Sequence, residues 1–217
     1  MSNKNFFTYT LLAEDEGKKY EEILFRHFHF SRKVLQKLKM GENVWVNGEF
    51  VYLNMRGQAG QTLIVNILED KFSTYPSING EDTPIEVIYE DTLFLAVNKP
   101  PGQVVHPNAK YQSGTLANAV IGYWEKKGES RPFRPIFRID RNTSGVVLIA
   151  KNRYAHQQLA WLSAKNQVVK KYFGIVEGPF PLDQGEFSSP IRLKAGSKII
   201  REVHKDGQPA LTLFKTL

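Results

Sequence analysis

One carboxylate stands alone in a long basic stretch of this 217-residue sequence. Asp140 is the only acidic residue between Ser130 and Val176, whereas the same interval contains nine basic residues. These are Arg131, Arg134, Arg138, Arg141, Lys151, Arg153, Lys165, Lys170 and Lys171. Neighbouring cations favour the charged form of a carboxylate, and together they attract a polyanion. Such a carboxylate can act as a base or as a nucleophile.

The residues around Asp140 indicate how its side chain is presented. If residues 136–140 run extended, alternate side chains lie on opposite faces of the backbone. Arg138 and Asp140 then project together, while Phe137 and Ile139 point into a core. An isolated Arg-x-Asp pair is also typical of a structural ion pair at the end of a strand, so the pattern alone leaves both interpretations open.

The composition is that of a globular protein without thiol chemistry. Hydrophobic residues make up 41% and charged residues 24% of the chain, and there is no cysteine. Disulfides and thiolate metal sites are therefore excluded. Residues 1–70 contain nine basic and nine acidic residues, whereas residues 71–217 contain 20 and 13 and carry the whole net charge of +7. This division suits nucleic acid as a partner of the C-terminal part, although cytosolic proteins are often mildly basic without binding any.

The N-terminal part predicts two short helices followed by a hairpin. Residues 18–28 have one apolar stripe, and Ser31 is a suitable N-cap for a second helix that reaches Met40. Asn47-Gly48 between two β-prone runs is a strong hairpin signal, and residues 63–67 predict another strand. The outer face of the second helix is basic, through Arg32, Lys33, Lys37 and Lys39.

The rest of the chain alternates strand and helix signals. Residues 71–84 have linker composition. The expected elements are strands at 85–89 and 93–97, a helix capped by Thr115, a strand at 146–150 buried on both faces, a helix from Asn152 to Ser163, and a strand at 168–176. Lys99 and His106 lie in loops, where they can touch phosphate or equally be solvated or hydrogen-bonded residues.

Several segments resemble one enzyme family. Arg138-Ile139-Asp140-Arg141-Asn142-Thr143-Ser144-Gly145 is similar to the R-L-D-x-x-T-S-G motif of the RluA-type RNA pseudouridine synthases, in which the aspartate is catalytic. V-I-Y-E-D-x-L-x-x-x-V-N-K-P-x-G-x-V-V-H-P resembles the opening of their catalytic domain, and V-V-K-K-Y-F-G-I-V-E-G resembles their active-site tyrosine segment. The N-terminal helices and hairpin resemble an S4 RNA-binding domain.

The resemblance implies a reaction without a cofactor or a metal. The bond between ribose C1′ and uracil N1 breaks, the base turns, and C5 joins C1′. The aspartate either attacks covalently or removes a ribose proton, and the target nucleotide is flipped out of its helix. The implied catalytic residues are Asp140, Tyr172 and Arg138, and the implied RNA-binding residues are Arg32, Lys33, Lys37, Arg141 and Lys170.

Two departures from the family keep other functions open. Phe137 stands where the family has histidine, and the sequence stops at Leu217, before the family's G-R-x-H-Q-I-R-type segment with its partner arginine. We therefore expect the C-terminal part of the catalytic domain to be missing. The alternatives are a non-catalytic RNA-binding or ribosome-assembly protein with a truncated synthase domain, and a protein-docking role for residues 1–70.

Other chemistries fit less well. A glycosidase normally needs two flanking carboxylates, and Asp140 has no acidic neighbour in sequence. The five histidines are scattered, and no phosphate-binding glycine loop is present.

These observations predict an α+β protein: an S4-like α/β domain over residues 1–70, a linker over 71–84, and a synthase domain over 85–217 with a mixed, mainly antiparallel sheet and flanking helices. No segment has the length of a membrane span or the composition of a targeting signal. We expect a cytoplasmic monomer that acts on structured RNA, ribosomal rather than transfer RNA, with no metal, cofactor or membrane partner.

Overall fold

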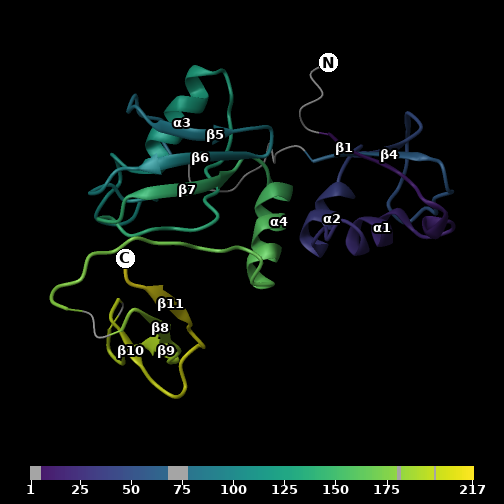
Figure 1. The fold of residues 1–217 in the computed structure, drawn as a ribbon. Coiled ribbons are helices and arrows are strands. Elements are labelled where there is room, and N and C mark those ends of the chain that lie inside the picture. The colour runs from purple at the N-terminus through teal and green to yellow at the C-terminus, as the bar shows by residue number, and fades with distance from the viewer. Residues whose placement is uncertain (1–5, 68–77, 180–181, 198) are drawn as a thin grey trace. The chain divides into compact units, whose positions relative to one another are not determined.

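The computed structural model describes residues 6–67, 78–179, 182–197 and 199–217 (Figure 1). The chain divides into two units, Met1–Val169 and Lys170–Leu217. The predicted boundary between residues 70 and 85 falls inside the first unit. Half of the predicted linker, residues 71–77, lies outside the described residues, so this domain division stays a prediction.

A four-stranded antiparallel sheet forms the N-terminal part of the first unit. Its strand order is β1 (Phe6–Thr10), β4 (Thr62–Asn66), β2 (Val44–Val46) and β3 (Glu49–Phe50). Asn47 and Gly48 both have positive φ, 50° and 90°, as the turn of a two-residue hairpin requires. The predicted hairpin is thus confirmed, although β3 ends at Phe50.

Two short helices and a 3-10 turn cover this sheet. They are η1 (Ala13–Asp15), α1 (Tyr20–Arg26) and α2 (Arg32–Leu38). Ser31 caps α2 as expected, because its hydroxyl accepts a hydrogen bond from the amide of Val34 at 3.3 Å. The apolar stripes of both helices are buried against the sheet in a core that includes Tyr20, Ile23, Leu24, Phe30, Leu35, Val44, Leu63 and Val65.

A buried carboxylate ties the 3-10 turn to β1. Asp15 Oδ2 accepts hydrogen bonds from the Tyr9 hydroxyl at 2.5 Å and the Leu12 amide at 3.1 Å. Burial alone would raise the pKa of Asp15, but these bonds and the electrostatic influence of nearby His27 and Lys18 outweigh it and lower the pKa. Burial and the bond to Asp15 raise the pKa of Tyr9 to about 12.

A second antiparallel sheet carries the Asp140 region. Its order is β5 (Glu86–Glu90), β6 (Phe94–Lys99) and β7 (Gly145–Ala150), and α3 (Leu116–Lys126) covers one face (Figure 1). The core between them contains Leu95, Val97, Leu116, Val120, Trp124, Val147 and Ile149. The prediction that β7 is buried on both faces is wrong at its start, because Val146 is 62% exposed.

The chain turns from β7 directly into α4 (Arg153–Ala164). Asn152 caps this helix as predicted, since its side chain accepts from the amide of Ala155 at 2.8 Å. Gln158 Nε2 of α4 donates to the carbonyl of Phe28 at 2.8 Å. With 12 residues, α4 is the longest helix described. None of the described helices has the length and apolar character needed to cross a membrane.

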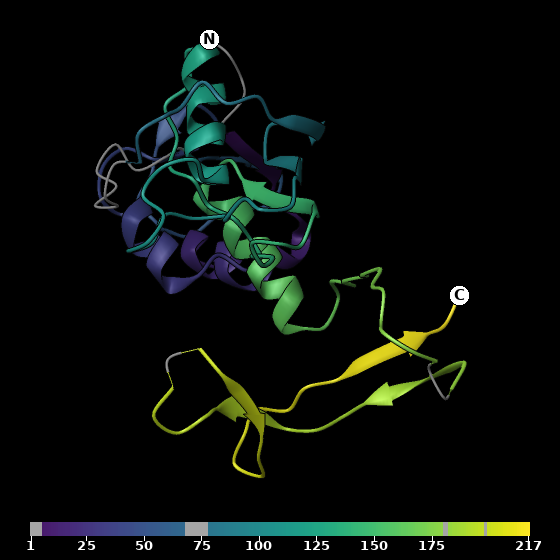
Figure 2. The same ribbon diagram turned by 90° about the vertical axis from the view of Figure 1, so that its left-hand side faces the viewer.

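The second unit consists of two small antiparallel pairs, drawn in yellow-green and yellow in Figure 2. One pairs β8 (Gln184–Phe187) with β11 (Thr212–Lys215), and the other pairs β9 (Ile191–Leu193) with β10 (Arg201–Val203). The strand predicted over residues 168–176 is wrong, because this segment has no regular structure. The α+β class is confirmed, and every strand pair in the described residues is antiparallel.

Candidate active site

The segment that carries Asp140 is anchored to β7. Upstream, the amide of Ile136 donates to the carbonyl of Leu148 at 2.8 Å. Downstream, the amide of Thr143 donates to the carbonyl of Asp140 at 3.2 Å and closes a turn that leads into β7. The predicted strand over 136–140 is wrong, because the pairing with β7 ends at Ile136 and the chain then leaves the sheet. Asp140 therefore lies on a loop.

The side chains of residues 137–140 still alternate between more buried and exposed positions, although no strand forms there. Arg138 and Asp140 are exposed, Phe137 is half-buried, and Ile139 packs against the core beneath the sheet. No ion pair joins Arg138 and Asp140, and the Asp140 carboxylate has no side-chain partner in the described part of the chain. The structural ion pair is thus not formed, and the carboxylate is exposed to solvent.

Lys99, at the end of β6, supports this loop through hydrogen bonds. It is completely buried at the end of β6, and its Nζ donates to the carbonyls of Pro100 and Gln103, both at 2.8 Å, and of Arg141 at 3.1 Å. Burial lowers the pKa of Lys99. The sequence left open whether this lysine touches phosphate, and its burial and three hydrogen bonds favour the hydrogen-bonded alternative. The predicted place of Lys99 in a loop is wrong, because it is the last residue of β6.

A second brace joins the Asp140 loop to the turn after β6. The amide of Gly102 donates to the carbonyl of Arg141 at 2.8 Å, and Arg141 Nε donates back to the carbonyl of Gly102 at 2.9 Å. The φ of +84° at Gly102 lies in the region that favours glycine. The Arg141 guanidinium carbon lies 5.2 Å from the centre of the Tyr111 ring. The residue after Asp140 is therefore fixed on both its backbone and its side chain.

Several of the basic residues near Asp140 in sequence serve structure. Arg131 Nε pairs with Glu129 at 2.8 Å, and Arg134 is buried. Lys151 is also buried, and its Nζ pairs with Glu90 at 2.7 Å. The positive charge that solvent meets at this loop therefore comes from Arg138 and Arg141, together with Lys110 beside Tyr111.

Tyr172 and Lys170 belong to the second unit. Tyr172 is 69% exposed within a segment that has no regular structure, and Lys170 is exposed as well. Asp140 lies in the first unit and Tyr172 in the second, so the predicted proximity of the two side chains stays a prediction.

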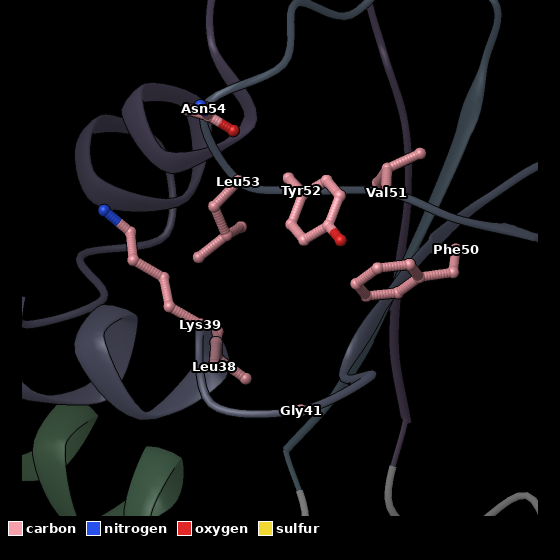
Figure 3. A pocket seen from close by; sticks show the side chains of 8 residues that line it. All are labelled: Leu38, Lys39, Gly41, Phe50, Val51, Tyr52, Leu53 and Asn54. Carbon is pink, nitrogen blue, oxygen red and sulfur yellow. The ribbon is translucent and has the colours of Figure 1, made fainter.

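The predicted RNA-binding residues of the N-terminal part lie on α2. Arg32 and Lys33 are exposed and Lys37 is half-buried, whereas Lys39 pairs with Glu21 at 2.6 Å. Beside the end of α2 lies an open, mainly apolar cavity of about 260 Å³ (Figure 3). It is lined by Leu38, Lys39, Gly41, Phe50, Val51, Tyr52, Leu53 and Asn54. Its lining includes none of the residues around Asp140.

One group of side chains has metal-ligand chemistry. Glu14, Asp15 and His27 bring potential ligand atoms within 4.8 Å of one another. Asp15 already accepts two hydrogen bonds, and His27 Nε2 lies 3.1 Å from its other oxygen. The internal bonds account for this geometry, so the group serves as a structural network that joins η1 to β1 and α1.

Sequence reasoning missed two of the residues that shape this site. It did not mention Tyr111, and it gave Lys99 no assigned role. An available signal for Lys99 was its place at the end of an apolar strand, where a lysine is buried only if carbonyl groups surround its ammonium. No local signal identifies Tyr111, because its partner Arg141 is 30 residues away.

Comparison with known proteins agrees with the motif around Asp140. The family model described as RNA pseudouridylate synthase matches residues 93–217, and the one described as RluD ribosomal pseudouridine synthase N-terminal domain matches residues 7–63. The S4 likeness of the N-terminal part stays a prediction.

Curated relatives match along nearly the whole chain. An uncharacterized RNA pseudouridine synthase of Bacillus subtilis, YhcT, is 31% identical over 94% of this chain and 67% of its own length. An uncharacterized RNA pseudouridine synthase of Aquifex aeolicus is 34% identical over 94% and 66%. Ribosomal large subunit pseudouridine synthase D of Buchnera aphidicola is 30% identical over 93% and 64%. This chain thus spans about two thirds of their length. With the first family model matching more than half of its residues, the chain belongs to the RNA pseudouridylate synthase family.

Proposed function

We propose that this chain is an RNA pseudouridine synthase in which Asp140 is the catalytic carboxylate. The observation that carries the proposal is the position of Asp140: it is exposed and unpaired within the described residues, on a loop that Lys99 and Gly102 brace, inside the segment that the family model matches. An acid that is rigidly supported yet open to solvent suits attack on a bound nucleotide.

The proposed reaction rearranges uridine without net gain or loss of atoms. The C1′–N1 bond breaks and the base turns. C5 then bonds to C1′, the hydrogen on C5 leaves as a proton, and N1 takes up a proton. Asp140 serves this sequence in one of two ways, by bonding to C1′ or by removing the proton from C2′. Both require the carboxylate to reach the ribose of a flipped nucleotide, which its exposure permits.

The proposed substrate is structured RNA, and large-subunit ribosomal RNA in particular. A relative that is 30% identical bears the name ribosomal large subunit pseudouridine synthase D, and the match to an RluD N-terminal domain supports the same substrate. The excess of basic residues after residue 70 suits a polyanion. Exposed Arg32 and Lys33 on α2 are proposed to contact its backbone, with Lys37 and Lys170.

The test is conversion of uridine in an unmodified large-subunit ribosomal RNA transcript by the full chain. Pseudouridine is read by carbodiimide (CMC) labelling and primer extension. We expect wild-type chain to give a stop at a defined uridine, and Asp140→Asn to lower its rate of formation by more than about a hundredfold. Asp82→Asn is the matched control, because it removes the same charge from an exposed aspartate that pairs with Lys126.

Two outcomes count against the proposal. If wild-type chain binds the transcript but forms no pseudouridine, the non-catalytic RNA-binding alternative is favoured. If Asp140→Asn keeps the full rate, another residue performs the reaction. Tyr172→Phe, assayed beside them, tests the proposed place of the tyrosine: a slower reaction with unchanged RNA affinity supports it, and an unchanged rate removes Tyr172 from the active site.

A further inference from the structure

We propose that Arg141 and Tyr111 form a fixed phosphate clamp beside Asp140, in which Arg141 binds a backbone phosphate of the RNA and Tyr111 positions the guanidinium. The inference rests on the proposed function, because it names what holds the RNA at that same site. It assigns Tyr111 the part of a positioning residue.

The guanidinium of Arg141 has contacts through its Nε and with the Tyr111 ring over which it lies. Its Nε donates to the carbonyl of Gly102 at 2.9 Å, and its central carbon lies 5.2 Å from the centre of the Tyr111 ring. Its backbone carbonyl accepts from the Gly102 amide and from buried Lys99. The two terminal nitrogens, Nη1 and Nη2, have no partner in the described part of the chain. They form the fork that matches two phosphate oxygens.

The Tyr111 ring is supported by its own turn. The amides of Lys110 and Tyr111 both donate to Asn108 Oδ1, at 2.9 and 3.1 Å. Asn108 and Tyr111 also exchange backbone hydrogen bonds at 2.9 and 3.2 Å. The ring is half-buried, so it offers Arg141 a stable face. A guanidinium fixed before binding loses less side-chain entropy when it meets a phosphate.

The charges around the clamp favour an anion. No acidic residue occurs between Thr92 and Trp124, the interval that contains Gly102 and Tyr111. Lys110 Nζ lies 5.5 Å from the centre of the Tyr111 ring and adds a second exposed cation. A carboxylate that meets the loop holding Tyr111 is that of Glu81, which accepts from the Gly114 amide at its far end. Asp140 directly precedes Arg141 in sequence, and the proposed function assigns its carboxylate to the ribose of the bound nucleotide.

A phosphate contact has a measurable signature in salt. Each phosphate neutralised by a protein cation releases counterions, and the slope of log Kobs against log salt changes by about 0.7 to 0.9. The probe is a fluorescein-labelled RNA hairpin with uridines in its loop, titrated with the full chain between 50 and 200 mM KCl. We expect Arg141→Ala to flatten the slope by about 0.7 to 0.9, and Arg141→Lys to restore it. Tyr111→Leu should weaken binding with the wild-type slope, since the charge remains but is no longer held.

Arg26→Ala is the matched control. It removes the same charge from an exposed arginine that already pairs with Glu22 at 3.3 Å, and we expect the wild-type slope. Thermal melting of every variant verifies that the fold is retained. The clamp is overturned if Arg141→Ala and Arg26→Ala give the same slope, or if Tyr111→Leu binds as tightly as wild type.

The experiments can refute the phosphate clamp and the proposed activity independently of each other. If the wild-type chain forms no pseudouridine but Arg141→Ala still flattens the slope, the activity is refuted and the clamp stands. If pseudouridine forms and the slope does not respond to Arg141→Ala, the clamp alone is refuted.

Discussion

Glu90, at the end of β5, accepts from three partners at once. Its Oε1 pairs with Lys151 Nζ at 2.7 Å, and its Oε2 accepts from Lys127 Nζ at 2.8 Å and from the Tyr123 hydroxyl at 2.7 Å. Burial alone would raise the pKa of Glu90, but these hydrogen bonds and the charge of Lys151 outweigh it and lower the pKa to about 2. One carboxylate thus joins β5 to α3 and to the start of α4.

This network makes stability depend on pH in a defined window. Because the folded pKa lies below the ordinary value of 4.5, the stabilisation is fully present above pH 4.5 and is lost as pH falls towards 2. We expect Glu90→Gln to lower the free energy of unfolding at pH 7 by about 2 kcal/mol, after allowance for solvent screening at Lys127. Urea denaturation, followed by tryptophan fluorescence at several pH values, measures it.

The difference between Glu90→Gln and wild type should shrink as pH falls from 5 to 2. Glu86→Gln on the same strand is the control, because Glu86 is exposed and its side chain accepts one hydrogen bond in the described residues, from Asn98 Nδ2. A difference that stays constant down to pH 2 would contradict the assigned cause.

At the scale of elements, Lys99 connects the end of β6 to the loop before β7. Lys99→Met removes one donor from three carbonyls and leaves an apolar chain of similar length in the same space. We expect a loss of roughly 2–3 kcal/mol of stability, since the carbonyls of Pro100 and Gln103 lose a charged donor and hydrogen bonds to charged groups are worth about 1.5–3 kcal/mol each. We also expect slower pseudouridine formation, because the Arg141 carbonyl loses a brace beside Asp140. Urea unfolding and the primer-extension assay read the two effects.

Lys165→Met is the control for this prediction, because Lys165 is an exposed lysine at the end of α4. A Lys99→Met variant as stable as Lys165→Met would show that water satisfies the three carbonyls. Reduced stability with an unchanged rate would show that the turn at Gly102 holds the Asp140 loop alone.

The starts of three helices were readable from the sequence. Ser31, Thr115 and Asn152 each accept a hydrogen bond from the amide three residues later, as their types predict. An N-cap side chain bonds to backbone in the same helical turn, so the local sequence is enough to predict it. The apolar stripe of α3 is local in the same way, and Trp124 is buried as expected.

Strands were less predictable, because a strand needs a partner that its own sequence does not contain. Residues 168–176 alternate as a strand would, yet Phe173 and Ile175 are exposed and the segment forms no strand pairing in the described residues. Conversely, β1 (Phe6–Thr10) was missed, although its aromatic and threonine residues have high strand propensity. At the candidate site, the motif predicted Asp140 from local sequence. The hydrogen bonds from Lys99 and Gly102 to the Arg141 carbonyl join residues far apart in sequence, so local sequence did not predict them.

At the scale of the whole molecule, the division after Val169 separates a unit with buried apolar cores from a unit in which many apolar side chains are exposed. The first unit has two buried cores. Within the second, Phe187 and Phe214 stack at 5.1 Å, and Arg192 pairs with Glu202 across β9 and β10 at 2.9 Å, but many of its apolar side chains are exposed. The segment that leads into this unit is the part of the chain where sequence and structure disagree most.

Limited proteolysis distinguishes the two descriptions of that segment. Lys170 and Lys171 are exposed and lie outside regular structure, so trypsin should cleave there before it cleaves at the buried lysines of the first unit. We expect mass spectrometry of brief digests to show an early fragment that ends at residue 170 or 171. Lys99 and Lys151 are buried and serve as internal controls, because cleavage after them should appear only late. If residues 168–176 instead pair as the strand that their alternation predicts, Lys170 and Lys171 will resist trypsin as long as these two lysines do, since proteases require locally unpaired backbone.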